Sequence, residues 1–272
     1  MKKIILLLAL ILIAVSCDIV DEPYLQDGAT VGDFRKKVVL LDFTAINCVY
    51  CPAANKVSQS LADLYGEENI ILLGAHASAL AEPKKAEDVD MRSETSAELF
   101  SKFATPTTGL PIGMVNQRLK DGVRLLNSGL WDKEIIDESF LEPDLSMEMQ
   151  LDYNETDGTV DITVECDYAK KGLNEDNLCI YITEDGIISP QKNNNEVIPD
   201  YEHKHVLRGS VTGTFGEPLK AGGADAGEKI TKTYTYKIPA GFNHDKLRFI
   251  AFVQNIETFF IKQATAEHLH EE

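Results

Sequence analysis

The feature that most limits the fold of this chain is a pair of apolar runs separated by one helical stretch. VVLLDF at 38–43 and NIILLGAH at 69–76 are continuous apolar runs, typical of strands buried on both faces. Between them, Val57, Leu61 and Leu64 recur at helical spacing. A strand, a helix and a second parallel strand form a right-handed crossover unit, so the sequence predicts an α/β domain here.

Two cysteines lie where the first run passes into the helix. The segment Cys48-Val49-Tyr50-Cys51 places the first thiol beside the helix N-terminus, where free N–H groups and the helix dipole stabilise a thiolate. Such a thiolate can attack a substrate disulfide, and the second cysteine can resolve the mixed disulfide that forms. The motif beside a strand–helix–strand pattern predicts thiol–disulfide chemistry.

Three separated features resemble the thioredoxin family. In LLDFTAINCVYC, Asp42 stands six residues before Cys48, at the spacing of that family's buried acid. Pro111 in GLPIG matches the cis-proline that faces the cysteine pair. The resemblance implies that Cys48 is the nucleophile and Cys51 the resolving thiol. It also implies that Asp42 is a buried proton acceptor near Cys51 and that Pro111 is a backbone shelf for the substrate chain.

The same segment also departs from thioredoxins. Thr44 and Asn47 stand where that family has tryptophan, and Val49-Tyr50 replaces the Gly-Pro between the cysteines. The redox potential is therefore open. The alternative is that the two cysteines have no catalytic role. They would then form a permanent short-loop disulfide, or remain unreactive thiols, in a domain that serves for binding, because fold alone does not fix function.

The second half of the chain has a different character. Five β-rich runs follow one another with turn residues between them: LSMEMQLDY, TVDITVECDY, NLCIYIT, EKITKTYTYKI and LRFIAFVQN. They predict an antiparallel sandwich of immunoglobulin-like size and spacing over residues 143–272. Its boundary with the thioredoxin-like α/β domain at 35–142 is set by Pro143, which ends a helical pattern that begins near Ser128.

The N-terminus predicts export. MKKIILLLALILIAVSC has a basic start, an apolar run from Ile4 to Val15 and a small residue before Cys17, which indicates a signal peptide over 1–16. The apolar run is about half the ~20 residues that a membrane-spanning helix needs. AVSC matches a lipobox, so Cys17 is predicted to carry lipid; plain secretion with an incidental cysteine is the alternative. The acidic residues at 17–34 then form a lipidated tether.

The order of these features resembles a narrower family. A lipobox, an acidic tether, DFTAINCVYCP, GAHAS, GLPIGMVN and a later HKHVLRGSVTGTFGE follow one another as in the outer-membrane-protein-twenty-eight (Omp-28-related) lipoproteins of bacteria. This resemblance covers nearly the whole mature chain, and it implies an outer-membrane lipoprotein with a thioredoxin-like domain and a β domain. Asp18, Asp21 and Glu22 resemble a surface-export signal, so a surface-exposed and a periplasm-facing anchor both stay open.

Charge and motifs exclude several partners. The chain has 26 basic and 44 acidic residues, a net charge of −18 with histidine neutral. Such a surface repels phosphate backbones and anionic lipid headgroups, so nucleic acid is not an expected partner. Phosphate loops, nucleophile-elbow serines and metalloprotease helices are absent from the sequence, and we expect no cofactor and no metal.

The remaining cysteines and histidines leave alternatives open. Cys166 and Cys179 lie equally far from the middle of a predicted hairpin turn, so they form either a structural disulfide or two buried free thiols. His203 and His205 would share one face of a strand. A polar contact between domains is favoured over a metal site, which needs three or four ligands. His76 ends a strand, and a structural role is expected for it.

Two functional hypotheses follow. The first is a lipid-anchored thiol–disulfide oxidoreductase that acts on exported proteins at the membrane. The second is a non-catalytic surface binding protein or adhesin, with a protein or glycan partner and the thioredoxin unit as its scaffold. The spacing of the cysteine motif supports the first, and the β domain with its acidic surface supports the second.

Overall fold

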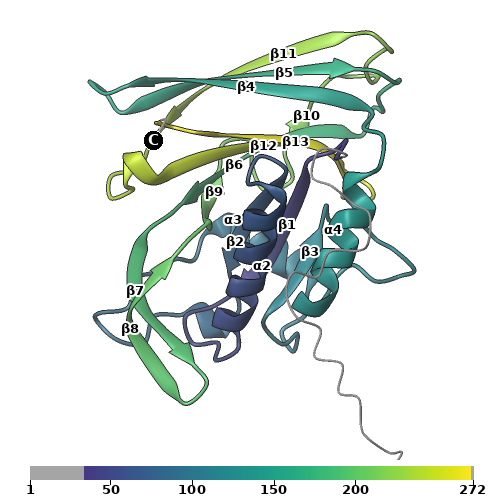
Figure 1. Cartoon of the computed structure of the whole chain (residues 1–272). Coiled ribbons are helices and arrows are strands. Elements are labelled where there is room, and N and C mark those ends of the chain that lie inside the picture. Colours follow the sequence, from purple (N-terminus) through teal and green to yellow (C-terminus); the bar gives the residue numbers. More distant parts are fainter. Residues whose placement is uncertain (1–33, 271–272) are drawn as a thin grey trace, which may run out of the picture.

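A computed structural model of the chain describes residues 34–270, and one large sheet lies at its centre (Figure 1). Its strands are β1 (Val38–Thr44), β2 (Ile70–His76), β3 (Ile112–Val115), β6 (Asp176–Glu184), β9 (Val206–Ser210), β10 (Glu217–Pro218), β12 (Leu247–Asn255) and β13 (Ile261–His268). They are ordered β13-β12-β6-β9-β2-β1-β3, and β10 pairs with β6. The predicted signal peptide, Cys17 and nearly all of the predicted tether lie outside the described residues.

Two smaller sheets and several helices surround the central sheet. The strands β4 (Leu145–Asn154), β5 (Thr159–Tyr168) and β11 (Lys229–Lys237) form a three-stranded layer, and β7 (Ile187–Asn193) and β8 (Glu196–His203) form a separate hairpin. The α-helices are α2 (Cys51–Tyr65), α3 (Glu94–Phe103) and α4 (Trp131–Ser139), with short 3-10 turns at Ala79–Ala81, Ser128–Leu130 and His244–Lys246. Within residues 34–270, no helix is long and apolar enough to cross a membrane.

The predicted strand–helix–strand unit is present. β1 and β2 are parallel, with Val38 opposite Ile70 and Thr44 opposite His76, and α2 connects them. β3 runs antiparallel to β1 on its other side. Alternate side chains of β1 pack against α2 and α4 on one face of the sheet and against α3 on the other. The continuous apolar runs therefore reflect strands that are covered on both faces.

The five runs predicted as strands in the second half form β4, β5, β6, β11 and β12. β4 and β5 pack across a shared apolar core against β6 and β12, with Ile162 and Val164 on one side and Ile180 and Phe249 on the other. This part of the chain therefore contributes strands to two packed layers of β-sheet, and one of the layers is the central sheet. The hairpin β7–β8 and the strands β9, β10 and β13 were not predicted.

The two halves of the chain share the central sheet. Gly74 of β2 pairs with Val206 of β9, and the Gly74 N–H donates to the His205 carbonyl across 2.7 Å. A Cβ at position 74 would lie 3.2 Å from that carbonyl oxygen, so the close approach favours glycine. The change from helices to strands falls between Ser139 and Leu145. The division into domains at 142 and 143 stays a prediction.

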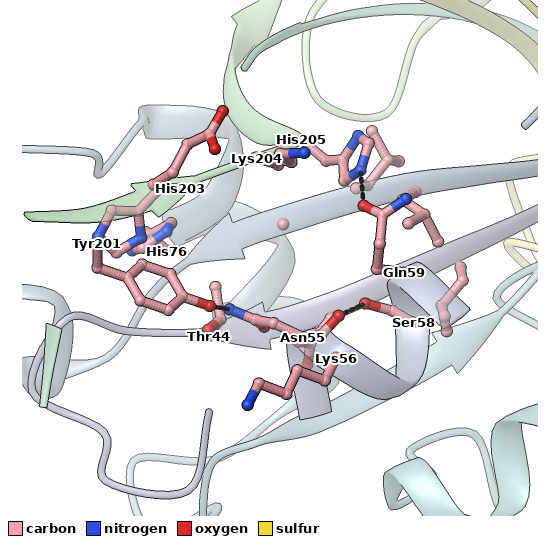
Figure 2. A pocket seen from close by; sticks show the side chains of 16 residues that line it. Thr44, Asn55, Lys56, Ser58, Gln59, His76, Tyr201, His203, Lys204 and His205 are labelled. Atoms are coloured by element: carbon pink, nitrogen blue, oxygen red, sulfur yellow. Dashed lines mark hydrogen bonds between the residues drawn. The ribbon is translucent and has the colours of Figure 1, made fainter. Parts of the chain in front are cut away.

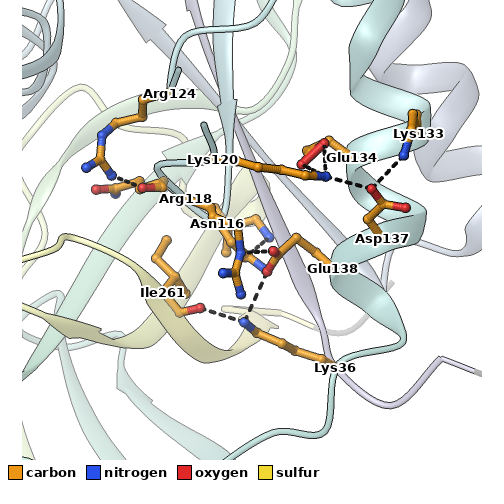
Figure 3. Close-up of polar contacts among 12 residues, drawn as sticks. Lys36, Asn116, Arg118, Lys120, Arg124, Lys133, Glu134, Asp137, Glu138 and Ile261 are labelled. Atoms are coloured by element: carbon orange, nitrogen blue, oxygen red, sulfur yellow. Dashed lines mark hydrogen bonds and ion pairs between the residues drawn. The ribbon is translucent and has the colours of Figure 1, made fainter. Parts of the chain in front are cut away.

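A buried charge cluster also joins the halves (Figure 3). The Glu138 carboxylate on α4 accepts hydrogen bonds from Asn116 at 3.1 Å, from Lys36 Nζ at 3.4 Å and from Arg118. Lys36 Nζ also donates to the Ile261 carbonyl on β13 across 2.7 Å. Burial lowers the pKa of Lys36 to about 8, against the opposing effect of the Glu138 charge. The cluster fixes α4 and the start of β1 to the last strand of the sheet.

Candidate functional site

The cysteine pair forms a disulfide at the start of α2. Cys48 and Cys51 are bonded, with Cα atoms 5.5 Å apart. Tyr50 is the N-cap residue, and Cys51 is the first residue of the helix, so the loop places the pair at the helix N-terminus as predicted. Cys48 is 3% exposed and Cys51 is fully buried, whereas Tyr50 between them is 64% exposed. The disulfide is therefore buried, whereas the aromatic residue between the two cysteines is exposed.

An apolar cluster covers the disulfide. Ala45, Ala81 and Leu110 pack against Cys48 and Cys51. Leu110 belongs to the loop before β3, and its peptide bond to the next residue, a proline, is cis. The proline that the thioredoxin resemblance singled out, at position 111, is therefore adjacent to a residue that contacts the disulfide.

Asn47 fastens one side of the cysteine loop. Its backbone N–H donates to the Leu80 carbonyl across 3.1 Å, and its side-chain nitrogen donates to the carbonyls of Leu80 and Glu82, each at 3.0 Å. These bonds hold the loop against the turn at Ala79–Ala81. Asn47 thus connects two loops through its side chain and its backbone.

The hairpin formed by β7 and β8 fastens the other side of the loop. It lies beside α2, apart from the other sheets (Figure 1). The Lys192 N–H donates to the Ile46 carbonyl, and the Asn194 N–H to the Val49 carbonyl, both across 2.9 Å. The backbone near the tip of the hairpin therefore pairs with the cysteine loop itself.

Gln191 adds a side-chain contact from the same hairpin. It is 1% exposed, and its Nε2 donates to the carbonyls of Ala45 at 3.2 Å, Cys48 at 3.0 Å and its neighbour Lys192 at 2.9 Å. The sequence contains no local signal for this role, because its partners in the loop lie more than 140 residues away. For that reason, Gln191 was not identified from the sequence as part of the site.

Asp42 is buried on β1 and linked to the cysteine pair. It is 5% exposed, and burial raises its pKa well above the usual range of a carboxyl group. With its amide nitrogen facing the carboxyl, Asn55 of α2 donates to Asp42 Oδ2 and to the Cys51 carbonyl, each across 3.2 Å. The Asn55 oxygen then accepts from the Tyr201 hydroxyl of β8 at 3.3 Å. A polar chain thus runs from the hairpin through Asn55 to Asp42.

A cavity of about 190 Å³ is lined in part by Asp42 (Figure 2). Its walls come from β1, β2, α2 and β8, and they include Thr44, His76, Tyr201 and His203. Asp42 Oδ1 and His76 Nδ1 are buried and have no hydrogen-bond partner in the described protein. Burial lowers the pKa of His76 to about 3 and that of His203 to about 4, so both rings are neutral at pH 7.

The two histidines of EHKHVLRG contact the α/β unit at different places. The His203 ring lies edge-on to the His76 ring, with centroids 5.4 Å apart. His205 does not share a strand face with it, because it lies between β8 and β9 with a φ of 54°. Its Nε2 lies 3.2 Å from Gln59 Oε1 on α2. The predicted polar contact between the halves is therefore present at His205, whereas His203 contacts the other half through its ring and hydrogen-bonds to Ser189 of its own hairpin.

The other two cysteines are free and buried, which is the second of the two alternatives left open for them. Cys166 faces the core between the two β layers, and Cys179 faces the opposite side of the central sheet. Since β5 and β6 belong to different layers and not to one hairpin, the thiols do not meet as a disulfide. Burial raises the pKa of Cys166 to about 12 and raises that of Cys179 as well.

Among residues 34–270, no three histidine, cysteine or acidic side chains come together in a way that could hold an ion. The groups that the site brings together are the cysteine pair, a buried carboxyl, and a cavity wall that holds two neutral histidines as well as Lys56 and Lys204.

Comparison with known proteins gives one family and several similar structures. The family model described as outer membrane protein Omp28 matches residues 101–267. HBP35 of Porphyromonas gingivalis is 21% identical with a TM-score of 0.65, over 86% of this chain and 76% of that chain. Protein AGR_C_4864 from Agrobacterium tumefaciens is 14% identical with a TM-score of 0.50, over 87% of this chain and 96% of that chain.

A third structure has a weaker likeness. A domain of the outer membrane lipoprotein Omp28 from Porphyromonas gingivalis is 21% identical, with a TM-score of 0.30, over 46% of this chain and 86% of that chain. No curated protein matches this chain. At these identities, the likeness to HBP35 and to AGR_C_4864 shows a shared fold and no more.

Proposed function

Because this chain belongs to the outer membrane protein Omp28 family, we propose that it is an outer-membrane lipoprotein whose disulfide site exchanges with thiols or disulfides of exported proteins. The lipid anchor is Cys17, proposed from the lipobox AVSC. A mature chain this acidic is repelled by anionic headgroups, so the folded part stands off the membrane on its tether. Labelling of intact cells with a reagent that does not cross the outer membrane distinguishes a surface-exposed from a periplasm-facing anchor.

A thioredoxin-like unit is the proposed carrier of this activity. Three features support it: the parallel crossover β1–α2–β2, the antiparallel strand β3 beside β1 and the disulfide at the N-terminus of α2. The β layers that follow supply the second part of the proposed architecture, an immunoglobulin-like sandwich at 143–272. The likeness to HBP35 supports the fold of the whole and carries nothing about activity.

The observation that carries the proposal is the burial of Asp42 on β1, with one carboxyl oxygen that has no hydrogen-bond partner among the described residues. A buried carboxyl with an unpartnered oxygen costs stability, and a permanent disulfide has no use for one. An exchanging pair does, because a buried thiol must lose its proton before it attacks. Perturbed titratable groups beside a reactive pair are typical of functional sites.

The proposed reaction starts from the reduced pair. The Cys48 thiolate attacks a substrate disulfide, forms a mixed disulfide and releases one substrate sulfur as a thiolate. The Cys51 thiol gives its proton to the Asp42 carboxylate and attacks the Cys48 sulfur. This breaks the mixed disulfide, releases the second substrate thiolate and restores the bond between Cys48 and Cys51. The substrate is reduced by two electrons and the cysteine pair is oxidised.

The test is turnover of a protein disulfide by the full chain in detergent micelles, with dithiothreitol as the reductant and insulin as the probe. We expect turnover above the dithiothreitol background, its loss in Cys48→Ser, and a trapped mixed disulfide in Cys51→Ser. Cys166→Ala is the control: it removes a buried cysteine of the β-rich half, outside the disulfide, and should turn over insulin at the wild-type rate. A wild-type rate equal to that of Cys48→Ser would contradict the proposal.

A second function is favoured by one observation, the burial of the disulfide. With Cys48 3% exposed and Cys51 fully buried, the bond could serve as a staple in a surface binding protein or adhesin that takes a protein or glycan partner. In that case Cys48→Ser lowers stability without an accompanying loss of the cellular phenotype. Loss of the phenotype in a Cys48→Ser protein that keeps its stability would argue for exchange instead.

A further inference from the structure

We infer that the β7–β8 hairpin is a latch over the disulfide, held by Gln191, and that exchange at Cys48 and Cys51 occurs only when this hairpin leaves the cysteine loop. The inference rests on the proposed function and adds its regulation. The chain would then keep its redox site closed until a partner displaces the hairpin.

The first support is the use of the Gln191 side chain. Its carboxamide nitrogen lies within 3.2 Å of three carbonyl oxygens, two of which, from Ala45 and Cys48, belong to the cysteine loop. A buried amide in this position is satisfied only while the loop and the hairpin are together. Separation replaces these bonds with bonds to water, which limits their net strength and makes opening possible.

The second support is the isolation of the hairpin. Among the described residues, β7 and β8 pair only with each other and join neither of the larger sheets. A two-stranded hairpin alone is marginal in water, so its position depends on what it packs against. Its tip is held to the loop by the backbone bonds from Lys192 to Ile46 and from Asn194 to Val49. Both bonds lie at the tip of the hairpin, away from the end of β7 where Ile187 packs against Ile46, Met91 and Val206.

The third support is that the two strands of the hairpin reach the two parts of the site. β7 supplies Gln191 to the cysteine loop. β8 supplies Tyr201, whose hydroxyl donates to Asn55, and His203, which lines the cavity beside Asp42. Movement of one hairpin would therefore uncover the disulfide and admit water to the buried carboxyl together.

The test follows reduction of the Cys48–Cys51 bond by dithiothreitol in the full chain in detergent micelles, with quenching by a thiol-specific mass tag. In Gln191→Ala, loss of the two loop bonds should speed reduction roughly five- to thirty-fold. Gln150→Ala, the same change at an exposed position on β4, should reduce at the wild-type rate. Lys192→Pro removes the backbone donor to Ile46, leaves Gln191 in place, and should also speed reduction.

A general loss of stability must be separated from opening of the latch. The chain has one tryptophan, Trp131, buried in α4 away from the hairpin, and its fluorescence reports global unfolding in urea. Local opening exposes little surface, so the reduction rate should be nearly independent of urea well below the unfolding midpoint. A rate that rises steeply with urea in parallel with global unfolding would overturn the latch.

The outcomes also separate this inference from the proposed function. If Gln191→Ala and Lys192→Pro are reduced faster than wild type but no form turns over insulin, the latch stands and the exchange function fails. If wild type turns over insulin and both variants are reduced at the wild-type rate, the function stands and the latch is wrong.

Discussion

The side-chain nitrogen of Gln191 lies 3.0 Å from the carbonyl oxygen of Cys48, although 143 residues separate them in the chain. This bond joins the β-rich half to the loop that carries the disulfide. Residues from both halves of the chain therefore surround the cysteine pair.

Asp42 should make the protein less stable as pH rises. Its folded pKa lies above that of the unfolded chain, so the unfolded chain releases its proton first, and the free energy of unfolding falls through the window between the two pKa values. The slope is at most about 1.4 kcal/mol per pH unit. Asp42→Asn should remove this slope and raise stability at pH 8, measured by urea unfolding from pH 5 to 9. Asp152→Asn, at an exposed position, is the control, and an Asp42→Asn protein less stable than wild type at pH 8 would contradict the account.

The buried histidines should produce the opposite dependence in acid. His76 and His203 have folded pKa values of about 3 and about 4, below the unfolded value of 6.5. Below pH 6.5 the unfolded chain binds protons that the folded chain does not, so the free energy of unfolding falls as pH decreases toward 4. His203→Gln should lower this slope by up to about 1.4 kcal/mol per pH unit. His268→Gln, at an exposed position, is the matched control, and an unaltered slope in His203→Gln would count against the buried, neutral ring.

Removing the charge of Glu138 should be costly. Glu138→Gln keeps the shape of the side chain but leaves the buried Lys36 ammonium without its anion, and breaking a buried pair in this way costs about 3 kcal/mol. The measurement is the urea midpoint at pH 7. The matched control is Glu142→Gln, which breaks the exposed pair with Arg35 and should cost less than about 1 kcal/mol. Equal shifts in the two variants would show that burial of the cluster does not determine its contribution.

Asn47→Ala should loosen the other side of the cysteine loop. The change removes the two side-chain bonds to the carbonyls of Leu80 and Glu82. Since Asn47 is only partly buried, we expect a smaller effect than for Gln191→Ala, about two- to five-fold faster reduction of the disulfide by dithiothreitol. Asn195→Ala, at an exposed position in the hairpin turn, is the control. No acceleration would mean that this tie does not limit access to Cys48.

Local pattern and spacing were enough to predict the crossover unit and the position of the cysteine pair. The apolar runs at 38–43 and 69–76 form adjacent parallel strands. They could be recognised because strands buried on both faces are continuously apolar. Cys48 and Cys51 are three residues apart at the start of α2, and this short separation allows the disulfide between them. Asp42 is buried, as the thioredoxin resemblance implied.

The hairpin and the shared sheet could not be predicted in the same way. β7 contains Pro190 and β8 contains Pro199, and proline argues against a strand in any local reading. β8 is mostly exposed and lacks the alternation that marks a half-buried strand. The pairing of Gly74 with Val206 joins segments that no spacing rule connects. These features depend on contacts far apart in the chain, so the closure of the site emerged only from the structure.

The midpoint potential of the Cys48–Cys51 pair tests the central claim most directly. It is measured by equilibrating the full chain in detergent with dithiothreitol and glutathione buffers of known potential and counting the reduced pair with a mass tag. Structural disulfides have potentials below about −300 mV, whereas pairs that exchange in function lie above that value. The proposed function predicts a potential above about −300 mV. A potential below about −300 mV would identify the bond as a permanent staple and contradict the account.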